Sequence, residues 1–103
     1  MLTLHAIEFP SRAIAAFCQS RHIARLSLFG SVLRDDFGPE SDVDVLVEFE
    51  EGKTPGLEFF GMGDELGEIL GRKVDLNTPG FLSRYFRREV LEKAVPFYDS
   101  RRD

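Results

Sequence analysis

Residues 28–47 read LFGSVLRDDFGPESDVDVLV and hold the most informative pattern in the chain. An apolar run ends at Gly30 and Ser31, ten residues intervene, and a second apolar run holds Asp42 and Asp44. Residues two apart on a strand point to the same face, so we expect the two carboxylates to project side by side. Neighbouring carboxylates repel each other unless a cation lies between them. The pair therefore favours a metal site, and its oxygen ligands suit Mg²⁺ or Mn²⁺ better than Zn²⁺.

The surroundings of the acid pair extend this interpretation. The small Gly30–Ser31 turn leaves backbone N–H groups free to hold a phosphate. A third acid, Asp75, lies in the short strand-like run KVDL, and acids on neighbouring strands can form a three-carboxylate cage. Most D-x-D pairs are solvated or turn-forming acids, but Asp44 lies within the apolar VDVLV, where unpaired charge is costly to bury. Metal ligands beside a phosphate-binding turn predict chemistry on a nucleoside triphosphate.

This arrangement resembles the nucleotidyltransferase superfamily related to DNA polymerase beta, and within it the minimal nucleotidyltransferase (MNT) family. The family motif reads GSxxR…SDxDhhV, and the matching residues are Gly30, Ser31, Arg34, Ser41, Asp42, Asp44 and Val47. Asp75 falls where the family has its third carboxylate, and the resemblance covers roughly residues 10–98. Many relatives have glycine after the motif arginine, whereas this chain has Asp35-Asp36, so Arg34 either clamps a phosphate or forms a local ion pair. Ser41 either binds a phosphate or braces the turn before the strand.

The resemblance implies metal-dependent nucleotidyl transfer, with two divalent ions about 3.5–4 Å apart. Asp42 and Asp44 would hold the ion that carries the triphosphate of ATP. Asp75 would complete the shell of the second ion and favour deprotonation of the incoming hydroxyl. Gly30 and Ser31 would contact the β- and γ-phosphates, and attack at the α-phosphorus would release pyrophosphate.

The resemblance also implies a class of partner. Short MNT proteins are commonly antitoxins of HEPN/MNT toxin–antitoxin systems, and some inactivate a HEPN ribonuclease toxin by transferring AMP to a tyrosine. Our leading hypothesis is therefore a protein adenylyltransferase that acts on a HEPN-type toxin. The competing hypotheses are a non-catalytic antitoxin that neutralises its partner by binding alone, and a domain that binds nucleotide without turnover. The three acids argue against both, because a pure binding protein needs no carboxylate cluster.

Length and composition limit the other possibilities. With 103 residues, 43% hydrophobic and 30% charged, the chain has room for one globular domain, residues 1–103. No apolar run approaches the ~20 residues that span a bilayer, and the N-terminus does not read as a secretion signal. The single cysteine, Cys18, excludes an intramolecular disulfide, agrees with a cytoplasmic location and lies at core spacing from Ile14. His5 and His22 have no partner at metal-ligand spacing and are interpreted as ordinary residues.

Charge is unevenly distributed along the chain. The net charge is −5, but residues 35–68 hold twelve acidic residues and one basic residue, Lys53. An acidic middle segment repels nucleic acid, so direct nucleic-acid binding is disfavoured. The acidic segment is either a solvated surface or a docking face for a basic partner protein.

Apolar spacing and the breakers Gly and Pro predict seven main elements in alternating order. We expect helices near residues 11–21, 31–36, 55–70 and 80–94, strands near 25–29, 42–49 and 73–77, and a short edge strand at 97–98. Gly71 should end the third helix, and Leu82, Phe86 and Val90 should form one buried stripe on the last. This order predicts an α/β (α+β) domain with a small mixed sheet flanked by helices. The resemblance implies the same polymerase beta-like nucleotidyltransferase fold.

Overall fold

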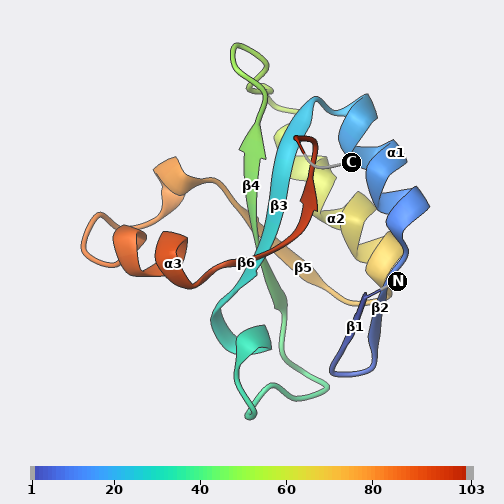
Figure 1. The fold of residues 1–103 in the computed structure, drawn as a ribbon, viewed down its shortest axis with the longest axis vertical. Helices are drawn as coiled ribbons and strands as arrows, with labels where there is room; N and C mark the ends of the chain where they lie inside the picture. The colour runs from blue at the N-terminus through green and yellow to red at the C-terminus, as the bar shows by residue number, and fades with distance from the viewer. Residues whose placement is uncertain (1, 102–103) are drawn as a thin grey trace.

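A mixed four-stranded sheet in the order β5-β4-β3-β6 forms the centre of the molecule (Figure 1). The computed structural model describes residues 2–101, with side chains from residue 5 onward. The strands of the sheet are β3 (Ile23–Phe29), β4 (Val43–Phe49), β5 (Val74–Asn77) and β6 (Val95–Asp99). β3 pairs antiparallel with β4 and with β6, and β4 pairs parallel with β5. The predicted mixed sheet is confirmed.

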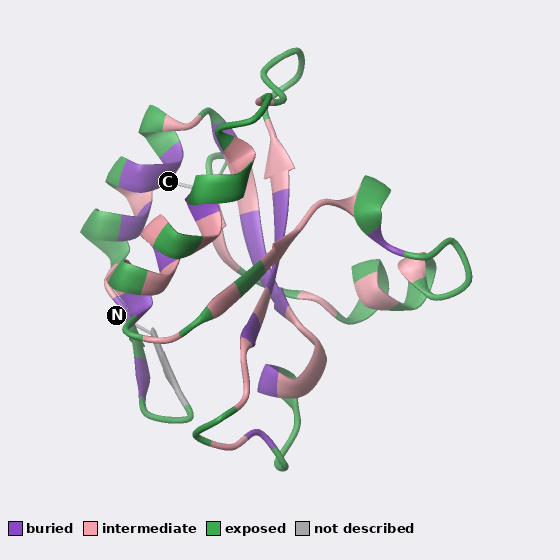
Figure 2. Ribbon diagram, turned by 180° about the vertical axis from the view of Figure 1, so that it is seen from behind, coloured by how far each residue is buried: buried purple, intermediate pink, exposed green. Residues whose placement is uncertain are grey.

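Two helices cover one side of this sheet, α1 (Ser11–Ser20) and α2 (Phe59–Leu70). Their buried residues pack against the alternating valines of β4 in a single core, which the purple ribbon segments in Figure 2 trace. The core residues from these elements are Ile14, Phe17, Cys18, Val43, Val45, Val47, Met62, Leu66 and Leu70. α2 begins four residues later than predicted but ends as expected, because Gly71 adopts the left-handed conformation with φ of 70°.

The other side of the sheet carries a broken segment where a continuous helix over 80–94 was predicted, and that prediction is wrong. The segment consists of the 3₁₀ turn η2 (Pro79–Phe81) and the short helix α3 (Arg87–Lys93). Leu82 leaves the helical path with ψ of 144° and is buried, whereas Phe86 is 47% exposed. The Ser83 side chain accepts a hydrogen bond from the Tyr85 N–H, a local alternative to helix hydrogen bonding. The expected stripe of three buried residues therefore does not form.

The predicted helix over 31–36 is also shorter, because the structure has only the 3₁₀ helix η1 (Gly30–Leu33). Arg34 returns to an extended conformation, and the chain then turns so that Phe37 is buried. The loop from Asp35 to Asp42 joins η1 to β4.

An N-terminal hairpin of β1 (Leu2–Leu4) and β2 (Ile7–Phe9) was not predicted. Its two-residue turn is formed by His5 and Ala6, which both have positive φ. Such turns favour Asn-Gly or Asp-Gly, and His5-Ala6 carries neither signal, so the hairpin could not be predicted from its turn residues. Within residues 2–101, no helix is long and apolar enough to cross a membrane.

Candidate active site

The beginning of β4 presents Asp44 on the side of the sheet away from α1 and α2. Val43 and Val45 are fully buried in the core, so the alternation of the strand turns Asp44 to the opposite face. In the sheet register Asp44 lies opposite Asp75 of β5 on one side and Phe29 of β3 on the other. Registered neighbours share a face, so Asp44, Asp75 and Phe29 all face this side.

The charges of the three predicted acids act on one another. Burial raises the pKa of Asp44, and the nearby carboxylates of Asp75 and Asp42 raise it further. The backbone N–H of Ser31 and the charge of Arg34 act in the opposite direction. Negative charge is thus concentrated at this end of β4, and the donors are hard oxygens, which fits a divalent cation such as Mg²⁺.

The three acids do not form a finished cage. In the part of the chain that the structure describes, no group of three or more His, Cys, Asp or Glu side chains is arranged to hold a metal ion as it stands. Asp42 is partly exposed and immediately precedes β4, and Asp75 is exposed on the edge strand β5. The three-carboxylate metal site stays a prediction.

Gly30 and Asp44 are in close contact. Gly30 has φ of 72°, and a Cβ placed on it would collide with Oδ2 of Asp44. The backbone N–H of the next residue, Ser31, is near enough to lower the pKa of Asp44. Glycine is therefore required both by the backbone conformation and by the approach of the acid. The structure brings together the Gly-Ser turn and the acid that the sequence separates by twelve residues.

The structure also bears on the two residues whose roles were left open. Arg34 is exposed and pairs with Asp36 at 3.3 Å between Nε and Oδ1, as the local alternative anticipated. The Ser41 hydroxyl accepts the N–H of Gly38 at 3.1 Å, which braces the turn before β4.

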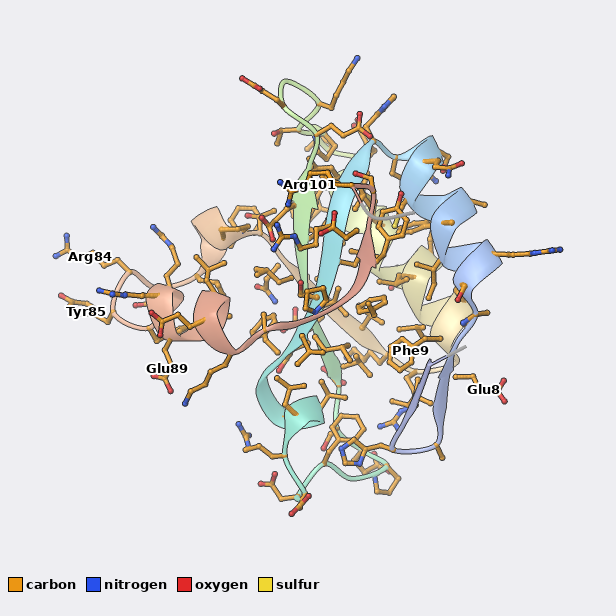
Figure 3. All side chains as sticks on the ribbon, viewed as in Figure 1. Glu8, Phe9, Arg84, Tyr85, Glu89 and Arg101 are labelled. Carbon is orange, nitrogen blue, oxygen red and sulfur yellow. The ribbon has the colours of Figure 1, made fainter. Side chains whose placement is uncertain are left out.

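A cavity of about 580 Å³ opens beside Gly30, between η1 and α3. It is lined by Phe29, Gly30, Leu33, Arg34, Phe86, Glu89, Val90 and Lys93. Its volume lies within the usual range of about 300–1,000 Å³ for small-molecule sites. The sequence analysis does not predict the cavity residues at α3, because the spacing of Phe86 and Val90 indicates a buried helix face. Figure 3 shows Glu89 projecting from α3, while Arg84 and Tyr85 point away from the sheet into solvent.

Cys18 takes no part in this site. It is fully buried on the core-facing side of α1, and burial raises the pKa of its thiol to about 12. A thiol with such a pKa is protonated at neutral pH and is a poor nucleophile. The prediction that Cys18 fills the core is confirmed.

Comparison with known proteins identifies the family to which this chain belongs. Residues 11–97 match the family described as "Nucleotidyltransferase domain". The protein adenylyltransferase MntA of Thermococcus cleftensis is 35% identical over 97 residues, covering 92% of this chain and 96% of its own. A protein of Methanocaldococcus jannaschii, named as a candidate protein adenylyltransferase, is 36% identical over 84 residues, 82% of this chain and 89% of its own.

Solved structures of similar fold are consistent with this family. A candidate minimal nucleotidyltransferase has a TM-score of 0.67 and 35% identity, with 84% of this chain and 90% of that chain covered. A toxin–antitoxin crystal structure with AMP-PNP has a TM-score of 0.68 at 18% identity, with 92% and 77% covered, and shows the shared fold. The chain belongs to the nucleotidyltransferase domain family and is a nucleotidyltransferase.

Proposed function

We propose that this nucleotidyltransferase moves AMP from ATP to a hydroxyl group of a partner protein, in a reaction that depends on Mg²⁺ or Mn²⁺. The observation that supports this most directly is the position of Asp44. It contacts the Gly30–Ser31 turn and lies in register with Asp75, so a phosphate site and an acid cluster adjoin. Phosphoryl chemistry requires that pair of features, because the triphosphate must be held while charge on the reacting phosphate is compensated.

Each residue has a role in the proposed reaction. Gly30 and Ser31 hold the β- and γ-phosphates through backbone N–H groups and the hydroxyl. Arg34, which lines the same cavity as Gly30, exchanges its pairing with Asp36 for a phosphate. Asp42, Asp44 and Asp75 hold two divalent ions. When bound, such ions stabilise charge on the transferred phosphate and lower the pKa of the incoming hydroxyl.

The cavity between η1 and α3 provides room for a nucleotide. Two of the predicted nucleotide-binding residues, Gly30 and Arg34, line it, and Phe29 places it on the same face as Asp44. Its other walls are the apolar side chains of Leu33, Phe86 and Val90, which suit a nucleoside better than a bare phosphate.

For the acceptor we propose a HEPN-type toxin, which would make this chain an antitoxin. The supporting facts are the adenylyltransferase names of relatives at 35–36% identity and the toxin–antitoxin structures that share the fold.

The test is transfer of label from α-³²P-ATP to a HEPN protein encoded beside this chain, with and without Mg²⁺. We expect label on the partner, a mass gain of one AMP, and loss of partner ribonuclease activity. Asp75→Asn should abolish transfer while leaving the fold intact. Asp64→Asn is the matched control, because Asp64 is an exposed acid on α2, away from the site.

The competing function, neutralisation by binding alone, predicts a different result. In that case Asp75→Asn would neutralise the partner as well as the native chain does. Full neutralisation by a variant with all three acids replaced, together with absence of label on the native pair, would contradict the enzymatic proposal.

A further inference from the structure

A chain of contacts runs behind the candidate site and joins three segments that are distant in sequence. The β1–β2 hairpin reaches the loop between η1 and β4, and the two lie side by side in both views (Figures 1 and 2). At the hairpin tip, His5 Nε2 lies 2.9 Å from the carbonyl oxygen of Val32, to which it donates as the Nε2–H tautomer. Val32 is the buried centre of η1, so this bond holds the 3₁₀ helix that begins with Gly30 and Ser31.

Phe37 lies in the middle of these contacts. Its ring is 4.9 Å from the His5 ring between centroids, and on it lies the guanidinium of Arg72, with Cζ 4.7 Å from the ring centroid. The contact of a tilted aromatic ring and that of a guanidinium with one phenyl ring are both favourable. Phe37 therefore connects the hairpin to the segment that follows α2.

Arg72 forms hydrogen bonds to the loop that precedes Asp42. Its Nη2 donates to the carbonyl of Gly38 at 3.0 Å and to the carbonyl of Ser41 at 2.8 Å. The Ser41 N–H donates back to Gly38 at 3.0 Å, so the turn is closed from two sides. Asp42 is the next residue along the chain, and its direction depends on this turn.

The end of α2 fixes Arg72 in place. The carbonyl of Gly67 accepts hydrogen bonds from the N–H groups of Gly71 and Arg72, at 2.8 and 3.2 Å. A Cβ on Gly67 would lie 2.9 Å from the Arg72 carbonyl oxygen, so the close approach needs glycine. Arg72 thus extends from a rigid helix end and not from a loose loop.

We propose that His5, Phe37 and Arg72 form a clamp that positions the two halves of the nucleotide site relative to each other. One half is the phosphate turn of η1, held through Val32, and the other is Asp42, held through Ser41. All three are positioning residues and do not act on substrate, since His5 and Arg72 bond backbone carbonyls and the Phe37 ring contacts both side chains. The clamp rests on the proposed function, and it adds residues that lie outside the GSxxR…SDxDhhV pattern.

Arg72→Lys is the main test, because lysine keeps the charge but lacks the planar group that bonds two carbonyls while stacked on Phe37. We expect faster hydrogen exchange at residues 31–34 and 38–42 and an increase of about tenfold in the KM for Mg-ATP. Arg12→Lys is the matched control, since Arg12 is exposed on α1, and it should change neither quantity.

A second pair of variants tests the other end of the clamp and stays useful if Arg72→Lys fails to fold. His5→Ala removes the donor to Val32, whereas His5→Gln retains an N–H at the end of a side chain of similar reach. Both substitutions place a residue at the same positive φ, so backbone strain is matched. We expect faster exchange at residues 31–34 in His5→Ala and recovery in His5→Gln.

The possible outcomes separate the clamp from a general stabilising role. If Arg72→Lys lowers Tm and speeds exchange throughout α1 and β3 while KM stays native, the residues only stabilise the fold and the clamp is refuted. Native exchange and native KM in Arg72→Lys refute it as well. If the native chain itself neither binds Mg-ATP nor transfers AMP, the proposed function is refuted. The clamp is then tested only by hydrogen exchange measured in the absence of nucleotide.

Discussion

The side of the sheet that carries α1 and α2 is closed, whereas the side that carries α3 is partly open. α2 buries Met62, Leu66 and Leu70, but α3 has no buried residue at all. Figure 2 shows the same contrast, with purple segments on α1 and α2 and only pink and green on α3. Burial of apolar area stabilises the fold, while an open face leaves room for a ligand. The first side therefore holds the fold together, and the second side leaves room for the chemistry.

The largest expected effect tests whether stability resides on the closed side. Leu66→Ala should lower the free energy of unfolding by about 3 kcal/mol, because Leu66 is fully buried and alanine leaves a cavity. Leu91→Ala makes the same chemical change on α3, where Leu91 is 44% exposed, and should stay within about 0.5 kcal/mol. Urea unfolding measures both. Equal losses of unfolding free energy in the two variants would contradict the proposed difference between the two sides of the sheet.

The next effect combines stability and function at one glycine. Gly30→Ala should cost roughly 1 kcal/mol for the left-handed backbone and more for the collision with Asp44. Gly52→Ala is the matched control, because Gly52 has φ of 75° with open space around its Cβ position. We expect the control to lose only the backbone contribution and to keep native affinity for Mg-ATP in calorimetry. Native affinity in Gly30→Ala would show that the turn does not touch nucleotide.

A third substitution should raise stability and weaken nucleotide binding. Asp44→Asn removes a charge that burial, Asp75 and Asp42 all disfavour, so the variant without nucleotide should have a higher Tm than the native chain. The same change should weaken Mg-ATP binding by at least about tenfold, because the cation loses a ligand charge. Thermal unfolding and calorimetry on one sample test both. A lower Tm with unchanged affinity would mean that Asp44 serves the fold and not a metal.

The smallest expected effect concerns the wall of the cavity. Phe86→Ala should leave Tm nearly unchanged, because the ring is 47% exposed, but should raise the KM for ATP about threefold through lost contact with the nucleoside. Tyr85→Ala is its control, since Tyr85 is 86% exposed and points away from the sheet (Figure 3). An unchanged KM in Phe86→Ala would place the nucleoside elsewhere.

From the sequence alone, the closed side of the sheet and the face on which Asp44 lies could be predicted, whereas the roles of the site residues stay predictions. Apolar residues at helical spacing fixed α1 and the body of α2, and Gly71 fixed the end of α2, because burial and a left-handed cap are local properties. The alternation of Asp44 between Val43 and Val45 similarly fixed which face the acid takes.

The conformation of the segments on the open side depends on tertiary contacts. The residues from Pro79 to Lys93 have a helical pattern, but Leu82 is extended and buried while Phe86 is half exposed, and the helix begins only at Arg87. His5 and Ala6 take positive φ, and His5 bonds η1, which no local preference foretells. The clamp of His5, Phe37 and Arg72 joins residues up to 67 positions apart. Such contacts depend on which segments the fold brings together, and a pattern read along the chain does not contain that information.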